Sequence, residues 1–507
     1  MINVSDAWKD IQPRFLLPES YIEINCMITE AGAQESATVA GHNEIDFSNA
    51  STVLDVNRDL KPKYATNELN LWALDGSCDI LPDSGKDDGY VGSIEHTGSI
   101  TLSFPVIRTA AVSGITIVWG SRYGEYPRIF TVTAKNGSTA VAETTITDND
   151  DQVSEVFMEM QNYDSIVITV HQWYLNNRRV RIEKVTIGHT LTFTKDDLLS
   201  FTHEQHGDIL SGEVPKNSIE FTLNNVDNRW NPTNPFGMAQ YLTEQQKITV
   251  RYGLDVNGVP EWINAGTFYL TEWHAPSNGL EARFVARDAL GFLLNKEIKE
   301  TADGTSTQTG NLTSIARWAI GNLPSGSSVV ISIPASPTRD WEAKGNLAAI
   351  VQKCANAGCC IMRTSRDGVL YIEPLNKTDS GYRIPLSLSY SFPEIELAKP
   401  LKEVEVDYGG DAPYLHGVAR DGETQTLTNE LIYNEDTAKS VGAWVGDVLK
   451  NRKIVSGEFR ADPRLDLFDI VSVESKFGIL TPVVITNIKY VFEGSFKGSY
   501  TGRVLEV

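Results

Sequence analysis

Alternation of apolar and polar residues with a period of two runs through most of this chain. In the segment 21–28, Ile22, Ile24, Cys26 and Ile28 would share one face of a strand, because successive side chains of a strand point to opposite faces. The alternation therefore predicts a mainly β protein. The same pattern recurs, often between Gly, Asn, Asp or Pro turn residues, at 166–170, 219–223, 248–252, 369–373, 404–408 and 483–492.

Helical spacing is confined to the second half of the chain. Within 345–357, Leu347, Ile350, Val351 and Cys354 follow the spacing i, i+3, i+4, i+7, and a glycine comes directly after the last turn. This spacing buries one face of a helix, so we expect a helix there. The same reasoning predicts two further helices, at 312–323 and at 435–452.

Length and charge limit the classes of function. The 507 residues indicate several domains, because a domain averages about 150 residues. Lys and Arg total 44 against 66 Asp and Glu, a formal net charge of −22, and such a surface repels the phosphates of nucleic acids. We therefore expect no sequence-specific nucleic-acid binding. We also expect no membrane span, because no stretch approaches about 18 apolar residues.

Five scattered cysteines are too few for a disulfide framework, which fits assembly in a reducing cytoplasm. The N-terminus lacks the apolar core of a signal peptide. Stretches rich in Gly, Ser, Thr and Asn separate the alternating series and suggest domain boundaries. They predict four regions, of which the first is discontinuous: 1–64 with 188–300, then 65–187, 301–390 and 391–507.

Three blocks of the sequence resemble parts of one protein family. Residues 67–77 and 80–83, with Gly89 and Tyr90, are similar to the opening of a galactose-binding-like jelly roll inserted in tail proteins of phages of Gram-positive bacteria. Its continuation at 114–119, 123–127 and 178–182 fits the F5/8-type, or discoidin, carbohydrate-binding pattern. Residues 191–294 resemble the first barrel of phage baseplate or tail-tip hubs, through the segments 212–215, 221–225, 231–235, 241–242, 266–270 and 286–288.

The third block is at the C-terminal end. Residues 462–471, where an Asp-Pro-Arg turn precedes a strand, and the tail 483–507 look like the second barrel of the hub. The resemblance implies two hub-type β-barrels, a β-sandwich jelly-roll insertion at 65–187 and a small α+β domain at 301–390. The first barrel would combine 1–64 with 188–300, and the second would span 391–507 with its helix at 435–452.

The resemblance also implies a place and partners. Hubs of this family form a homotrimeric ring in the virion, at the tail tip or baseplate, and are assembled in the cytoplasm of the bacterial host. The implied partners are the tail tube or distal tail protein, the tape-measure protein and a spike or central tip protein. A structural hub is not an enzyme and needs no cofactor.

Aromatic and basic residues of the jelly-roll region are candidates for binding a host cell-wall glycan. Aromatic rings stack on the apolar face of a sugar, and Arg side chains donate to its hydroxyls. A core role for Trp119, and a capping role for the tyrosines, are the alternatives, and Trp173 is expected in a loop. The candidates are Trp119, Arg122, Tyr123, Tyr126, Trp173, Tyr174, Arg178 and Arg179.

Asp75, Asp83 and Asp87 lie in an acidic, Gly-punctuated stretch. Their oxygens would suit a structural Ca²⁺, although the spacing does not match an EF-hand and a solvated turn is the favoured explanation. His203 and His206 are three residues apart in strand-like sequence, so they do not form the two-histidine zinc motif of metalloproteases, and a structural or surface role is expected.

Motifs for nucleophilic catalysis and for phosphate binding are absent from the sequence. The leading hypothesis is therefore a structural hub of the tail tip that carries a glycan-binding insert. The first alternative is a tail protein whose main role is recognition of host-surface carbohydrate. The second alternative is a peptidoglycan hydrolase, because accidental pairs of carboxylates cannot be told from catalytic pairs without a structure.

Overall fold

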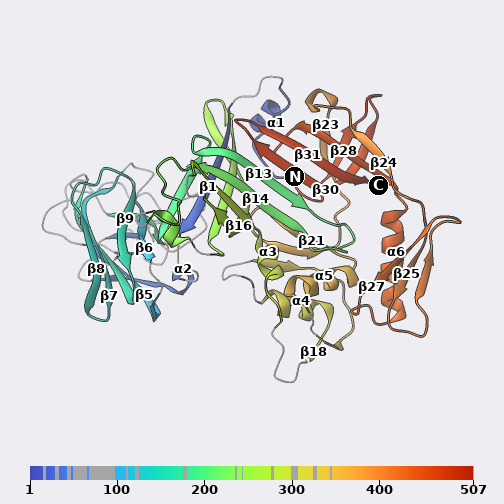
Figure 1. The fold of residues 1–507 in the computed structure, drawn as a ribbon, viewed down its shortest axis with the longest axis horizontal. Coiled ribbons are helices and arrows are strands. Elements are labelled where there is room, and N and C mark those ends of the chain that lie inside the picture. The colour runs from blue at the N-terminus through green and yellow to red at the C-terminus, as the bar shows by residue number, and fades with distance from the viewer. Residues whose placement is uncertain are drawn as a thin grey trace. The chain divides into compact units, whose positions relative to one another are not determined.

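A computed structural model gives the fold (Figure 1). Strands dominate it, so the prediction of a mainly β, multidomain protein is confirmed. The chain divides into two compact units, 1–25 with 192–237 and 247–507, and 26–191 with 238–246. The residues described are 1–14, 19–28, 33–42, 47–48, 65–67, 98–109, 112–119, 125–174, 180–234, 237–242, 244–275, 279–298, 307–321, 323, 328–342 and 345–505.

One thirteen-stranded sheet forms the frame of the first unit. Strand β1 (Ser20–Ile28) lies between β12 (His189–Thr194) and β15 (Lys247–Val256), so strands from before and after the sandwich segment pair in one sheet. The sheet continues in the order β16 (Val259–His274), β17 (Glu281–Arg287), β14 (Lys216–Asn224), β13 (Leu198–His206), β30 (Leu480–Phe492), β31 (Phe496–Val504), β28 (Lys453–Arg460) and β24 (Glu394–Leu397). Strand β29 (Ile470–Glu474) pairs with β30 and with β23 (Asp379–Ile384).

The strands of the two predicted barrels meet at the pair β13 and β30. Their register runs antiparallel, from Phe201 opposite Phe492 to His206 opposite Asn487. On β13, Phe201, His203 and Gln205 are buried, and the alternation places Glu204 and His206 on the other face. The contact between β13 and β30, called the seam below, is therefore a continuous part of the core.

The three longest described helices of the first unit begin at asparagine caps. Helix α4 (Leu312–Ile320) follows Asn311, α5 (Leu347–Ala357) follows Asn346, and α6 (Glu435–Leu449) follows Asn434. Each cap side chain accepts a hydrogen bond from a backbone N–H of the first turn, which would otherwise have no partner in the helix. All three predicted helices are confirmed, each ending within a few residues of the predicted limit.

These helices cover small sheets. Helices α4 and α5 pack together with α3 (Ala289–Leu294) in one apolar core. Around this core lie β18 (Thr307–Gly310) with β20 (Arg339–Glu342), and β19 (Val329–Ile331), β22 (Leu370–Glu373) and β21 (Ile361–Thr364). Helix α6 packs on the sheet of β26 (Tyr414–Gly417), β25 (Leu401–Asp407) and β27 (Glu423–Thr428). The remaining short helices of this unit are α1 (Asp6–Ile11) and η4 (Leu386–Leu388).

The cap of α6 carries a testable prediction. Asn434 Oδ1 accepts the backbone N–H of Thr437 at 2.8 Å. Asn434→Ala removes this bond and should cost about 1 kcal/mol of local stability. Hydrogen exchange of the first-turn amides of α6 would then speed up, whereas Asn434→Asp, which keeps an acceptor, should leave it close to the unchanged rate. Equal exchange in the alanine variant would show that the cap contributes nothing.

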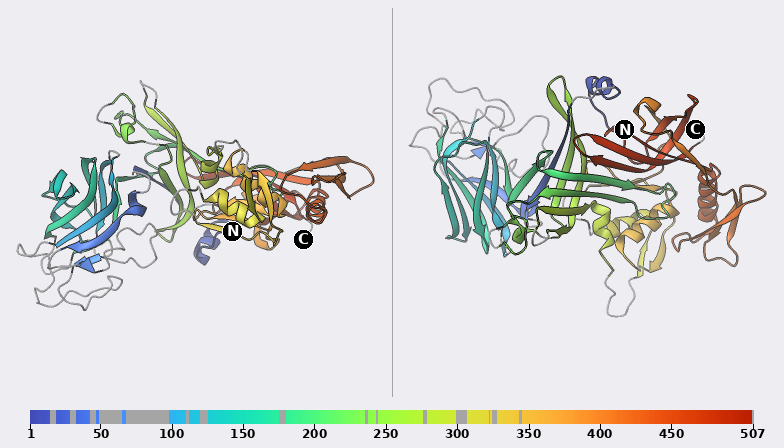
Figure 2. Two further views of the ribbon diagram at one scale, coloured as in Figure 1. Left: turned by 90° about the horizontal axis from the view of Figure 1, so that it is seen from below. Right: turned by 45° about the horizontal axis from the view of Figure 1, so that its top comes forward.

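The second unit is a sandwich of two five-stranded sheets (Figure 2). Its core is made of apolar side chains from both sheets. One sheet has the order β2 (Thr38–His42), β5 (Gly98–Arg108), β10 (Tyr163–Trp173), β7 (Pro127–Asn136) and β8 (Thr139–Ile146). The other has the order β3 (Phe47–Ser48), β4 (Ala65–Asn67), β11 (Arg181–Ile187), β6 (Val112–Trp119) and β9 (Val153–Met160), and α2 (Ala33–Ser36) and η3 (Met238–Tyr241) complete the unit.

The division into two units is coarser than the four predicted regions, whose boundaries stay a prediction. Residues 238–246 group with the sandwich, although the sequence assigns them to the first barrel. Among the residues described, no helix is long and apolar enough to cross a membrane.

Candidate functional site

Two of the predicted sugar-binding residues, Tyr126 and Tyr174, form an aromatic pair on the sandwich. Their ring centroids are 4.7 Å apart at an angle of 37°, and the backbone N–H of Tyr174 donates to the carbonyl of Tyr126 at 2.9 Å. Tyr174 is 48% exposed and Tyr126 is half-buried. Burial, with smaller effects of Tyr174 and Asp150, raises the pKa of Tyr126, so its hydroxyl keeps its proton at neutral pH. The pair offers both an aromatic surface and hydroxyl donors.

Trp119 and Trp173 lie in the core of the sandwich, which corrects their assignment to a surface platform. Trp119 is 0% exposed and Trp173 is 1% exposed, and their rings meet edge to face at 5.9 Å. The indole N–H of Trp119 donates to Ser154 Oγ at 2.8 Å. Trp173 is the last residue of β10, not part of a loop, and the alternation of that strand turns it inward. Neither indole can stack on a sugar in this arrangement.

A buried ion pair, which the sequence does not reveal, lies at the same end of the sandwich. Arg181 Nη1 contacts Glu125 Oε2 at 3.0 Å, and the indole N–H of Trp173 points to the same oxygen at 3.3 Å. Glu125 and Arg181 are 2% and 3% exposed. Glu125 directly precedes Tyr126, Trp173 is the last residue of β10 and Arg181 is the first residue of β11, so these contacts connect the three segments. Because a buried charge is costly without its partner, the pair fixes the backbone that carries both tyrosines.

The other predicted residues of the sandwich lie outside the described part of the chain. These are Arg122, Tyr123, Arg178 and Arg179 for the glycan, and Asp75, Asp83 and Asp87 for Ca²⁺. Their roles stay predictions. Among the residues described, no group of three or more His, Cys, Asp or Glu side chains is arranged to hold a metal ion.

A buried polar network lies where β13 meets β30. His203 Nδ1 is 2.7 Å from Tyr252 Oη, and His203 Nε2 is 2.8 Å from Asn217 Oδ1. Tyr490, also fully buried, donates its hydroxyl to the carbonyl of Leu465 at 2.6 Å. His203 therefore has the structural role that the sequence analysis expects.

Arg366 is the cation of this network. Its Nη1 donates to the carbonyl of Pro463 at 2.6 Å, its Nη2 donates to the carbonyl of Leu465, and its Nε lies 3.5 Å from Asp466 Oδ1. The guanidinium also lies over the rings of Tyr252 and Tyr490, at 5.8 and 5.6 Å. Arg366 is 5% exposed. Through Tyr252 on β15 and Tyr490 on β30, it links the loop between β21 and β22 to both parts of the large sheet.

The Asp-Pro-Arg turn, residues 462–464, and the residues directly after it accept the hydrogen bonds of Arg366. Within the turn, Arg464 pairs with Asp462 through its Nε at 3.0 Å from both carboxylate oxygens, and its backbone N–H donates to Asp462 Oδ1 at 3.0 Å. Gln205 on β13 donates to Asp466 Oδ1 at 3.2 Å. The turn that resembles the hub family is thus the point where residues from three regions of the sequence meet.

Burial and Arg366 set the protonation of this network. Burial, followed by the positive charge of Arg366, lowers the pKa of His203 to about 3, so His203 is neutral at pH 7. Burial opposes ionisation of Asp466, but the Arg366 guanidinium outweighs it and keeps the pKa of that carboxyl below its usual value. A neutral histidine held between a phenol and an amide has no open side for a substrate. The network therefore acts as a brace between the two parts of the sheet.

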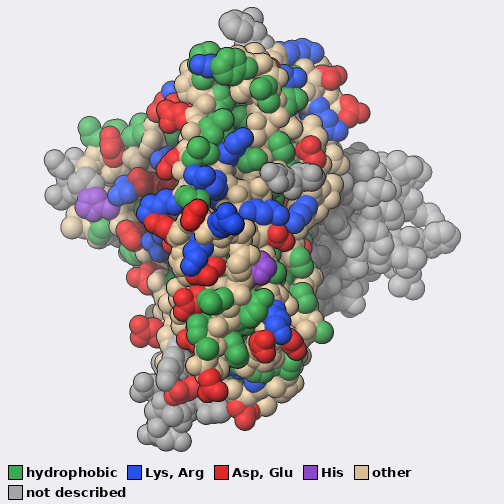
Figure 3. Space-filling model, turned by 90° about the vertical axis from the view of Figure 1, so that its right-hand side faces the viewer, with side chains coloured by type: hydrophobic (Ala, Val, Ile, Leu, Met, Phe, Trp, Pro, Cys, Tyr) green, Lys and Arg blue, Asp and Glu red, His purple; other side chains and the backbone are tan. Residues whose placement is uncertain are grey.

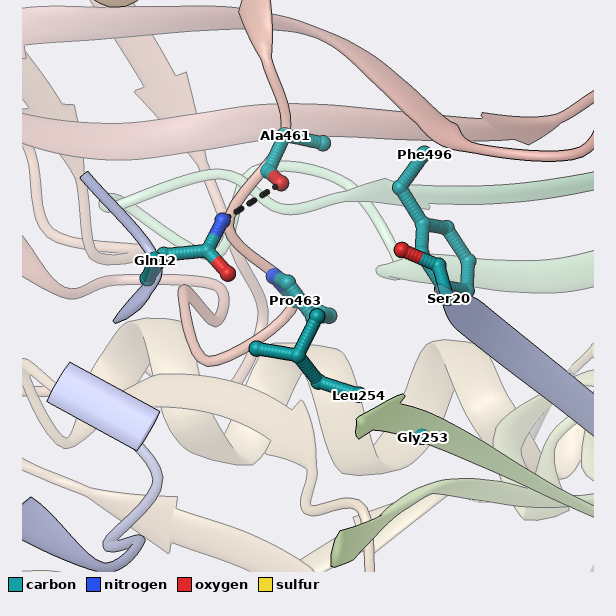
Figure 4. Close-up of a pocket in the computed structure, with 7 residues that line it drawn as sticks. All are labelled: Gln12, Ser20, Gly253, Leu254, Ala461, Pro463 and Phe496. Carbon is teal, nitrogen blue, oxygen red and sulfur yellow. Dashed lines mark hydrogen bonds between the residues drawn. The ribbon is translucent and has the colours of Figure 1, made fainter. Parts of the chain in front are cut away.

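A cavity beside this brace, lined in part by Pro463, is too small for a substrate (Figure 4). It encloses about 10 Å³, which is room for one water molecule. The side-chain amide of Gln12 donates across it to the carbonyl of Ala461 at 3.1 Å. Its lining consists of Gln12, Ser20, Gly253, Leu254, Ala461, Pro463 and Phe496.

Comparison with known proteins finds similarity among solved structures. No protein-family model and no curated protein matches the chain. The 43 kDa tail protein of prophage MuSo2 from Shewanella oneidensis is 14% identical, with a TM-score of 0.44, and the match covers 62% of this chain and 94% of that one. A tail protein from Neisseria meningitidis MC58 is 12% identical, with a TM-score of 0.45 and the same two coverages. Prophage tail protein gp18 from Listeria monocytogenes EGD-e is 12% identical, with a TM-score of 0.41 over 62% of this chain and 91% of that one.

Proposed function

We propose that this chain is a structural, non-enzymatic subunit of the tail tip of a phage or phage-like particle, where it forms the hub ring that continues the tail tube. The continuous sheet is the observation that carries this proposal. It joins the two segments whose sequences resemble the two barrels of tail hubs, and the buried network around Arg366 braces them where they meet. A rigid pair of barrels is what a ring subunit needs in order to keep a channel open.

The proposed ring contains three copies, each contributing two barrels. Its proposed neighbours are the tail tube or distal tail protein on one side and a spike or central tip protein on the other, with the tape-measure protein inside. Assembly would take place in the cytoplasm of the bacterial host. The net charge of −22 supports a channel that lets DNA pass without binding it.

Labelling of assembled particles tests the proposal. An antibody against this chain, carrying gold, should mark the end of the tail distal to the head, with three copies per particle by quantitative mass spectrometry. An antibody against the major tail-tube protein, marking the whole tail length, is the control. Label on the head, along the whole tail or absent from the particle would overturn the proposal.

We infer a second role, host-glycan binding, for the sandwich, and the Tyr126–Tyr174 pair supports it. The pair is partly open to solvent, while the buried Glu125–Arg181 ion pair holds its backbone in place. A preformed aromatic surface binds at a lower entropic cost than a flexible one. If the ring is trimeric, three weak sites would bind one cell wall with high avidity.

Removal of the Tyr174 side chain tests the proposed glycan binding. Tyr174→Ala in the full chain should weaken retention on host cell-wall polysaccharide about tenfold, because truncating an aromatic contact at the centre of a site costs more than about 1 kcal/mol. Phe477→Ala, which removes a 76% exposed aromatic ring of the first unit, is the matched control and should bind normally. Equal retention of both variants would rule out a contribution of Tyr174.

A further inference from the structure

The terminal strand β24 carries apolar side chains that are open to solvent. Within the residues described, β24 pairs with β28 alone and ends the path of the large sheet. Ile395 is 53% exposed and Leu397 is 60% exposed. Natural proteins rarely leave such an edge bare, because its free N–H and C=O groups can pair with another strand.

The exposed face of β24 is a continuation of the protein's own core face. Ile395 lies directly opposite Val455 on β28, and residues opposite each other in a sheet point to the same side. Val455 is only 1% exposed, so the face that is covered at β28 is bare one strand further out. Glu394 and Glu396 alternate with the apolar residues and point to the other face.

The bare edge is longer than β24 itself. The backbone N–H of Tyr390 donates to the carbonyl of Glu458 at 3.0 Å, and that of Ala398 donates to the carbonyl of Arg452 at 2.8 Å. Backbone bonds therefore hold both ends of the segment 390–398 against β28, and residues 394–397 within it are the paired strand. Phe392, which lies in this segment, is 62% exposed. An edge of this length can accept a full strand or a loop from a partner.

Cations lie beside this edge. Lys399 follows the segment directly and pairs with Glu423, Arg452 donates its Nε–H to the carbonyl of Ala398 at 2.7 Å, and Lys453 lies opposite Leu397. Figure 3 shows Lys and Arg side chains gathered across the middle of the face at this end of the first unit. In a chain with a net charge of −22, such a strip would attract an acidic surface of another copy.

A rim of the first barrel has the complementary character. It adjoins β12, the strand at the opposite end of the large sheet, and three large apolar side chains are exposed there: Leu199 (52%), Val226 (65%) and Leu280 (66%). Backbone bonds hold the rim together, from Asn225 to Leu280 at 2.7 Å and from Asn224 to Asp197 at 3.3 Å. Its exposed carboxylates are Asp196, Asp197 and Glu281.

We propose that the β24 edge of one copy packs against this acidic rim of a second copy of the same chain. The two surfaces are different and both have apolar centres, and Lys453 beside the β24 edge is opposite in charge to the carboxylates of the rim, which gives a head-to-tail contact rather than a twofold one. A head-to-tail contact closes into a ring when its rotation divides a full turn. The inference rests on the proposed hub function and assigns the surfaces through which the ring closes.

Removal of the apolar edge is the first test. The full chain with Ile395→Ser and Leu397→Ser should sediment as a monomer at concentrations where the unchanged chain is a trimer, with at least a tenfold weaker association. Leu415→Ser, which removes a leucine of similar exposure (54%) on β26, is the control and should still form trimers. An unchanged trimer in the double variant, or a monomeric unchanged chain at all concentrations, would overturn the inference.

A charge exchange tests the choice of the acidic rim. Lys453→Glu and Asp196→Lys should each weaken the trimer at low salt. Combined in one chain they should restore it at least in part, because every head-to-tail contact would again join opposite charges. Additive weakening in the combined variant would overturn the rim as the counterpart. Gold labelling of particles decides the hub function separately, because a chain found at the tail tip keeps that function even if β24 plays no part in assembly.

Discussion

Replacing Arg366 by methionine should lower the local stability of the seam between β13 and β30 by about 3–5 kcal/mol. The substitution leaves Asp466 without its cation and the carbonyls of Pro463 and Leu465 without their donors, in a site where Arg366 itself is 5% exposed. Breaking a buried ion pair from one side is costly because the remaining charge stays buried. Hydrogen exchange of peptides from 198–206 and 480–492 would measure the loss.

Arg363→Met is the matched control for this prediction. Arg363 pairs with Glu373 at 3.0 Å and lies over the ring of Tyr371, but both charged side chains are about a quarter exposed. Pairs in contact with water contribute about 0–1 kcal/mol, so exchange at the seam should hardly change. If both variants exchanged alike, the Arg366 network would not be the brace of the two barrels.

His203 should make the first unit less stable as the pH falls from about 6.5 towards 3. The pKa of His203 is about 3 in the folded chain, so between these values only the unfolded chain takes up the proton. The stabilisation that neutral His203 provides is fully present above pH 6.5, and about 2 kcal/mol of the free energy of unfolding is lost at pH 5. His203→Gln cannot take up this proton and should lose about 2 kcal/mol less than the unchanged chain between pH 7 and pH 5.

Urea unfolding of both proteins at the two pH values measures this difference. Burial raises the pKa of Asp288 to about 6, so its proton uptake favours the folded state over part of the same range. That effect is common to both proteins and cancels in the comparison. His206→Gln, on the opposite face of the same strand, is the control. A parallel fall of stability in His203→Gln and the unchanged chain would contradict the assigned protonation of His203.

Local pattern was sufficient to predict the strands at the alternating runs and all three long helices. The alternation at 21–28 and 483–492 and the spacing at 347–354 depend only on which side of an element is buried. The joining of the two predicted barrels in one sheet was not predictable in this way. It depends on which edge strands meet, and nothing in the pattern of β13 names β30 as its neighbour.

The candidate site shows the same limit. Tyr126 and Tyr174 were predicted, and they do come together, because the ends of β7 and β10 pair. The inward turn of Trp173 follows from the phase of β10, which a single residue at the end of a strand does not reveal. The Glu125–Arg181 pair lies between residues 56 positions apart, and a carboxylate beside a tyrosine gives no sign that it is buried.

The sandwich enters and leaves the chain between neighbouring strands of the frame. Thr192 Oγ1 donates to Asn25 Oδ1 at 2.7 Å. The residue that precedes the segment 26–191 is therefore bonded to the residue that follows it. A cassette attached at two adjacent points can be exchanged for another without moving the strands on either side. Under the proposed function, exchange of this cassette would change the surface that binds the host and leave the strands of the frame in place.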